Sequence, residues 1–167
     1  LRTPEAFAST KWFGKAAAAA GMMEFSDKSL PNSLVQLGEA GEVKTAVAAF
    51  DKLLVVFGLR RGSRSAALEA LMALGRSGSG TLLATELWLQ VIKQMSGRSV
   101  SAAERVTGYE VLSAYAGAFV PSDDFAPFLD WWLMTAGRGG GGEAGAQVCA
   151  SVRRALRALR GGVGASR

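Results

Sequence analysis

Apolar residues recur every three or four positions along most of the chain, which is the spacing of one face of an α-helix. In the clearest run, residues 42–57, the apolar positions are Val43, Val47, Phe50, Leu54 and Phe57. Residues 81–96 repeat the pattern with Leu83, Leu87, Val91 and Met95, and Trp88 widens the stripe. No run alternates apolar and polar residues as a half-buried strand does. The pattern therefore predicts an all-α fold.

Glycine, proline and capping residues divide the pattern into about seven or eight helices. A pair of short turns is expected around Pro31, and Gly75 is expected just past the end of the fourth helix. Ser101 and Glu104 have the spacing of a capping box, and Ser122 is an expected N-cap. The expected helices cover residues 4–20, 42–57, 65–74, 81–96, 101–120, 122–136 and 144–160.

These helices predict one compact domain over residues 1–160, because a chain of this length can bury a core of its own. Inside it, the Gly-rich stretch 137–142 is an expected internal linker, and residues 161–167 are an expected flexible tail. The most apolar stretch, near 43–57, contains three charged residues and is too short to cross a bilayer, so no transmembrane segment is expected. No signal peptide is expected either.

Composition removes most catalytic chemistry. The chain has no histidine, which excludes Ser-His-Asp triads, Cys-His pairs and imidazole-ligated metal sites. It has no P-loop motif, and its Gly-rich stretches do not follow strands. Cys149 is the only cysteine, so no internal disulfide can form. We therefore expect a non-catalytic domain with no cofactor and no metal.

Positive charge is concentrated near the end of the chain. Residues 138–167 hold six Arg and one Glu, whereas the other 137 residues hold 13 basic and 13 acidic groups. Such a patch is either a solvated helix face or a site that attracts an acidic polymer. Aromatics do not interleave with the arginines and no DNA- or RNA-binding motif is present, so nucleic acid is not expected. The candidate binding residues are Arg153, Arg154, Arg157, Arg160, Arg60, Arg61, Arg64, Lys93, Arg98 and Arg105.

Several segments resemble the MyTH4 domain of unconventional myosins and of plant-type calmodulin-regulated kinesins. The strongest is ELWLQVIKQ at 86–94, which is similar to a family helix of the form E-[IL]-aromatic-x-Q-[IL]-x-K-Q. The helix at 43–58 is similar to the family's "A…F…I…YMG" helix. The other matching segments are FSDKSLPNSLVQL at 25–37, GYEVL at 108–112 and Pro121-Ser122. The RRALRALR segment at the end resembles the basic closing helix of the kinesin-type members, which favours a kinesin-like parent over a myosin.

Two positions depart from the family pattern. Leu83-Ala84-Thr85-Glu86 stands where the family often has L-R-D-E, and Tyr109 replaces the usual Trp. The core near Tyr109 must therefore repack around a smaller ring. Because the chain lacks an initiator Met and a following FERM domain, we expect it to be a domain excised from a longer protein.

The resemblance implies a MyTH4-type helical bundle in the tail of a cytoplasmic, cytoskeleton-associated motor. Its basic surface would bind microtubules through the acidic tails of tubulin, and the domain would pack with an adjacent FERM domain for cargo attachment. The alternative is a myosin-type scaffold that binds a partner-protein peptide without contacting microtubules. Trp131 and Trp132 are expected in the core, and either becomes a candidate docking residue if it faces solvent. Residues expected to maintain the fold and the register of the helices are Glu86, Trp88, Gln90, Gln94, Tyr109 and Pro121.

Overall fold

The computed structural model describes residues 22–97, 99–139 and 141–164, which contain six α-helices and no sheet. The predicted all-α class is confirmed for this part of the chain, with fewer helices than the seven or eight expected. The predicted helix at 4–20 lies outside the described residues. The helices are α3 (Ala40–Val56), α4 (Arg64–Ser77), α5 (Leu82–Gln94), α6 (Ala102–Ala116), α7 (Ala126–Gly139) and α8 (Gly142–Gly164).

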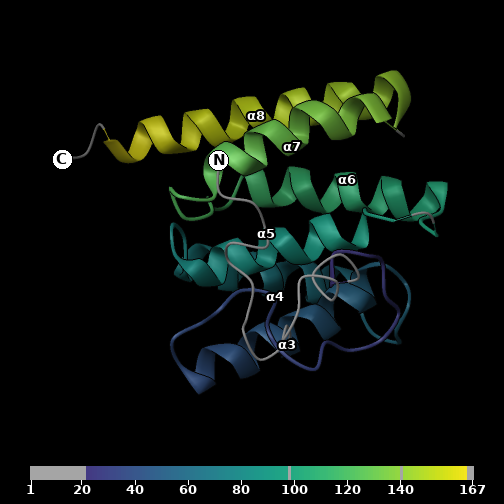
Figure 1. Cartoon of the computed structure of the whole chain (residues 1–167), viewed down its shortest axis with the longest axis vertical. Helices are drawn as coiled ribbons and strands as arrows, with labels where there is room; N and C mark the ends of the chain where they lie inside the picture. Colours follow the sequence, from purple (N-terminus) through teal and green to yellow (C-terminus); the bar gives the residue numbers. More distant parts are fainter. Residues whose placement is uncertain (1–21, 98, 140, 165–167) are drawn as a thin grey trace.

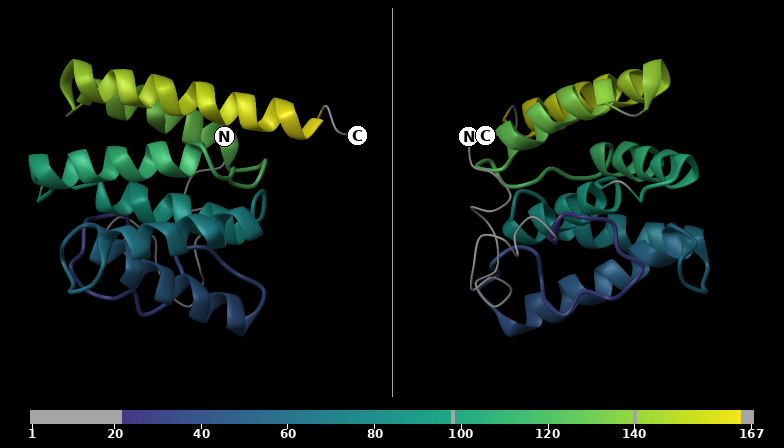
Figure 2. Two further views of the ribbon diagram at one scale, coloured as in Figure 1. Left: turned by 180° about the vertical axis from the view of Figure 1, so that it is seen from behind. Right: turned by 45° about the vertical axis from the view of Figure 1, so that its right-hand side comes forward.

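The helices form a stack of layers with α5 near its centre (Figures 1 and 2). One side of the stack is the pair α7 and α8; α6 lies beneath α8, and α5 packs between α6 and α3. From Ala84 to Gln94 every residue of α5 is buried, so this helix is enclosed by the rest of the domain. None of the described helices is long and apolar enough to span a membrane.

Aromatic rings hold α5 against the end of α6. The Trp88 ring meets the Tyr115 ring edge-on at a centroid distance of 5.6 Å and lies 5.8 Å from the Phe119 ring. All three side chains are fully buried. Such pairs add about 0.5–1.5 kcal/mol beyond the area they bury. This cluster places Trp88 in the core, as the apolar stripe predicts.

Gly75 does not end α4; it lies within the helix and lets Phe119 approach. A Cβ placed on Gly75 would come within 2.1 Å of the Phe119 ring, so only glycine fits against this side chain. The helix continues to Ser77. The prediction of a glycine stop was wrong here because the glycine serves close packing, not a left-handed turn.

Two other boundaries also differ from expectation. In the expected linker 137–142, residues 137–139 belong to α7 and Gly142 begins α8, while residue 140 lies outside the described residues. Of the expected tail 161–167, residues 161–164 continue α8, and residues 165–167 lie outside the described residues. Glycine weakens a helix by about 1 kcal/mol per residue but keeps its N–H donor, so a helix can extend through short glycine runs.

Of the two predicted helix caps, one is formed and the other is not. The capping box of Ser101 and Glu104 is present, with both reciprocal hydrogen bonds formed. Ser122, by contrast, lies four residues before α7 and is bonded to Thr85. The two hydroxyl oxygens are 2.9 Å apart, and the Ser122 backbone N–H donates to the Thr85 hydroxyl. This contact ties the α6–α7 connection to the start of α5.

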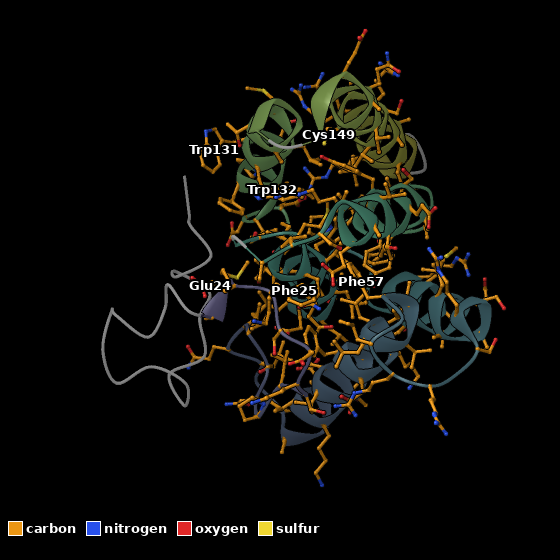
Figure 3. All side chains as sticks on the ribbon, turned by 90° about the vertical axis from the view of Figure 1, so that its right-hand side faces the viewer. Glu24, Phe25, Phe57, Trp131, Trp132 and Cys149 are labelled. Carbon is orange, nitrogen blue, oxygen red and sulfur yellow. The ribbon has the colours of Figure 1, made fainter. Side chains whose placement is uncertain are left out.

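The adjacent tryptophans of α7 face different surroundings (Figure 3). Trp132 is half-buried and packs against the core, but Trp131 projects outward and is 48% exposed. The expectation that both are core residues was wrong for Trp131, because adjacent helical positions point about 100° apart. Cys149 is buried on the α8 side of the same pair.

Candidate functional site

The motif residues of α5 bind the irregular segment that precedes α3. Glu86 accepts hydrogen bonds from the backbone amides of Leu34 and Val35, at 3.0 and 2.6 Å. The Gln90 amide nitrogen donates to Glu86 at 2.9 Å and to the Ala46 carbonyl of α3 at 2.8 Å. Burial raises the pKa of Glu86 to about 7, although these hydrogen bonds oppose the shift.

About two turns after Glu86, the end of α5 also binds the backbone of the preceding segment. The Gln94 side chain accepts from the Ser26 amide at 3.1 Å and donates to the Ser26 carbonyl at 2.9 Å, as a strand neighbour would. The ammonium of Lys93 donates to the Glu24 carbonyl. Glu24 and Phe25 accordingly lie against this side of the bundle (Figure 3). We call the polar residues Glu86, Gln90, Lys93 and Gln94 the α5 clamp.

Lys93 is therefore not part of a surface. Its side chain is 4% exposed, and burial lowers its pKa to about 8. The sequence suggested a binding role because Lys93 is close in sequence to Arg98 and Arg105. The structure instead turns it toward the segment at residue 24. Arg98 lies outside the described residues, and Arg105 is half-buried on α6.

The arginines that follow α3, up to the first residue of α4, are mostly paired. Arg60 donates to the Ser29 hydroxyl at 2.7 Å and lies 3.7 Å from the Asp51 carboxylate. Arg64 forms an ion pair with Glu110 of α6. Arg61 is exposed and has no ion pair with another described residue. Exposed pairs of this kind add little stability, at most about 1 kcal/mol each.

On α8, three of the four predicted arginines pair with carboxylates of α7 or of the connection that precedes it. Arg153 binds Asp130 through two hydrogen bonds, at 2.7 and 3.0 Å. Arg157 lies 3.6 Å from the same carboxylate, and Arg160 lies 3.9 Å from Asp123. The hydrogen bond from Arg153 is the main cause of the lowered pKa of Asp130.

A small cavity of about 220 Å³ lies between the start of α7 and this part of α8. The three arginines and Asp130 supply its polar lining. Its other walls are Pro121, Ala126, Pro127, Leu129 and Leu156. We call it the α7–α8 pocket. Arg154 does not line it; it is exposed and bonds to Ser151.

The basic clusters do not form one surface. The α3–α4 connection and the last turns of α8 lie at opposite ends of the stack (Figures 1 and 2). The convergence of arginines that would make a single binding face is therefore absent from the described part of the chain.

A larger apolar groove, which the sequence did not reveal, lies between the first halves of α6 and α8. Its volume is about 690 Å³. Val106, 57% exposed, stands at its edge, and the Tyr109 hydroxyl abuts α8 where Gly141 and Gly145 leave no Cβ in its way. The lining residues are Ala102, Arg105, Val106, Tyr109, Glu110, Ser113, Gly141, Ala144, Gly145 and Val148. We call it the α6–α8 groove.

Comparison with known proteins finds similar folds in MyTH4-FERM domains. No family model matches the chain. A curated relative, the high molecular weight form of myosin-1 from Acanthamoeba castellanii, is 30% identical over 138 residues, covering 83% of this chain. Among solved structures, the MyTH4-FERM MF1 domain of Dictyostelium discoideum myosin VII aligns over 90% of the chain with a TM-score of 0.72 and 15% identity. The MF2 domain of the same myosin aligns over 82% with a TM-score of 0.69 and 19% identity.

The chain thus has a MyTH4-type helical fold, as its motifs predict. It spans 9% of the curated relative and 28–30% of these two solved chains. These similar proteins are myosins, so they do not support the kinesin-type parent suggested by the basic closing helix. Two arginines of that helix form ion pairs with Asp130 of α7, which explains part of its basic character without a microtubule.

Proposed function

We propose that this chain is a non-catalytic scaffold domain of a myosin-type tail, which binds a segment of a partner protein in the α6–α8 groove. The observation that carries the proposal is the groove itself, because exposed apolar hollows of this size mark binding sites. The similarity to MyTH4-FERM structures supports a tail position beside a FERM domain and a cytoskeleton-associated location.

The charges at the groove favour one kind of segment. Glu110 is paired with Arg64, whereas Arg105 has no ion pair with another described residue. The groove therefore presents apolar walls with one uncompensated positive charge. An amphipathic helix suits it, with its apolar face against Val106 and Val148 and an acidic residue near Arg105.

A peptide library displayed on phage tests this proposal against a matched pair of variants. Val106→Glu places a charge at the edge of the groove, and Leu82→Glu makes the same change at an exposed apolar position of α5 that does not line it. Peptides selected on the wild-type chain should bind Leu82→Glu equally and lose Val106→Glu. Failure to select any peptide, or equal binding to all three proteins, contradicts the proposal.

Microtubule binding through the acidic tails of tubulin is a second candidate. Arg61 and Arg154 support it, because both are exposed and neither is ion-paired with a described residue. Co-sedimentation with polymerised tubulin at low and moderate salt tests it, with the Arg61→Glu and Arg154→Glu variants alongside. Salt-sensitive pelleting that both variants reduce supports this function. Pelleting that survives removal of the tubulin tails rejects the electrostatic mechanism.

A further inference from the structure

The side chain of Arg160 carries unsatisfied hydrogen-bond donors at the α7–α8 pocket. Its Nε and Nη2 atoms are shielded from solvent and have no hydrogen-bond partner among the described residues. The nearest carboxylate, that of Asp123, is 3.9 Å from Nη2, beyond hydrogen-bond distance, and is itself fully exposed. Shielded donors of a charged group are costly unless an acceptor satisfies them.

The charges around these donors do not balance. Three arginines and one carboxylate line the pocket. Asp130 uses both of its oxygens to bind Arg153. Arg157 is 3.6 Å from the same carboxylate and Arg160 does not contact it. Even with Asp123 counted, two carboxylates meet three arginines, so one positive charge remains at the pocket.

The shape of the pocket selects the ligand. About 220 Å³ holds a single side chain and is too small for a nucleotide. Pro121, Leu129 and Leu156 form apolar walls that fit methylene groups. The Nε–H and Nη2–H groups of a guanidinium are parallel, so one carboxylate can accept both once the Arg160 side chain turns toward the pocket. The start of α7 also lines the pocket, and the helix dipole adds attraction for an anion there.

We infer that the α7–α8 pocket is a receptor for one carboxylate-bearing side chain, a Glu or Asp, of a partner protein. The inference rests on the proposed function only in that the ligand belongs to a partner. The pocket shares no lining residue with the α6–α8 groove, so each site can be tested without the other.

NMR of the Arg Nε–H groups in the full chain tests the inference, with a blocked tetraglutamate peptide as the probe. The Nε–H signals of Arg157 and Arg160 should shift saturably, and tetraglutamine should have no effect. Arg160→Gln should weaken binding by about tenfold, since a hydrogen bond to a charged group contributes about 1.5 kcal/mol. Arg154→Gln removes the same charge from an exposed position of the same helix and should leave the affinity unchanged.

Other arms separate the alternatives. Arg160→Lys keeps the charge but loses the paired donors, so it should also weaken binding, and it replaces Arg160→Gln if that variant does not fold. Val106→Glu should not affect tetraglutamate binding, whether or not the α6–α8 groove binds a peptide. Equal weakening by Arg160→Gln and Arg154→Gln would show diffuse attraction and overturn the inference. So would the absence of a saturable shift, or equally tight binding of inorganic phosphate.

Discussion

Glu86 and Val35 are joined across 51 positions of sequence by one short hydrogen bond, in which the Val35 amide donates to the Glu86 carboxylate at 2.6 Å. Glu86 is fully buried, and its other oxygen accepts from Leu34 and Gln90. Residues 30–37 are not helical, so their backbone amides lack the hydrogen bonds that a helix would provide. The buried Glu86 carboxylate accepts hydrogen bonds from two of these amides instead.

The buried carboxyl of Glu86 predicts a pH-dependent stability. Burial raises its pKa from 4.5 to about 7, so the folded chain binds a proton that the unfolded chain has released between these values. The contribution of Glu86 is therefore fully present below pH 4.5 and falls as pH rises to 7, by about 3 kcal/mol. Urea unfolding of the wild type and Glu86→Gln at pH 5 and pH 8 measures it. The stability difference between the two proteins should change with pH; a constant difference contradicts the assignment.

Gly75→Ala should destabilise the domain. The new Cβ would overlap the Phe119 ring, which is fully buried and cannot move without disturbing Trp88 and Tyr115. Overpacking of this kind costs about 1–3 kcal/mol. Gly161→Ala is the matched control, since that helical position is exposed and has open space around its Cβ site. Thermal unfolding should show a lower Tm for Gly75→Ala and an unchanged or higher Tm for Gly161→Ala.

Gln94→Leu should free the segment around Ser26 from α5. The change removes both hydrogen bonds to the half-buried Ser26 backbone and leaves its amide and carbonyl without these partners, at a cost of about 1–2 kcal/mol. Hydrogen exchange should show faster exchange at Ser26 than in the wild type. The same substitution at Gln147, which is exposed on α8, should not affect this amide. Unchanged protection in Gln94→Leu would mean that the clamp does not hold the segment.

Trp131 should be the tryptophan of α7 that solvent reaches. It is 48% exposed and touches Phe128 at a ring distance of 5.7 Å, whereas Trp88 is fully buried. Trp131→Phe should therefore reduce the fraction of fluorescence that iodide quenches, with little change in Tm. Trp88→Phe removes emission that iodide does not reach, so it should raise the quenchable fraction and lower the Tm. A Trp131→Phe variant with undiminished quenching would place this side chain in a covered position.

The helical class and the aromatic core follow from the sequence because periodicity records which face of a helix is buried. Glycine was less informative. The sequence alone does not distinguish Gly75, which makes room for Phe119, from Gly58, whose φ of 75° ends α3 after Phe57. Sequence patterns indicate local backbone preferences. The packing of Phe119 against Gly75 joins residues that are distant in sequence, so such patterns do not indicate it.

The candidate site was harder to predict for the same reason. The spacing of Arg153, Arg157 and Arg160 shows that they share a helix face, but not that Asp130 and Asp123 lie opposite them. The α6–α8 groove is harder still to predict, since its lining residues come from two helices that are about 40 positions apart in sequence. Val106, an apolar residue on the polar side of its helix, was the one clue.

The position of the α5 clamp has a consequence for how such domains diversify. The clamp lies at the centre and ties the irregular segment to the fold, whereas the groove and the pocket lie on the periphery, among α6, α7 and α8. Substitutions at the exposed lining residues of the groove and the pocket can therefore change those sites without disturbing the α5 clamp. The α5 segment carries the clearest family motif, and it lines neither the groove nor the pocket.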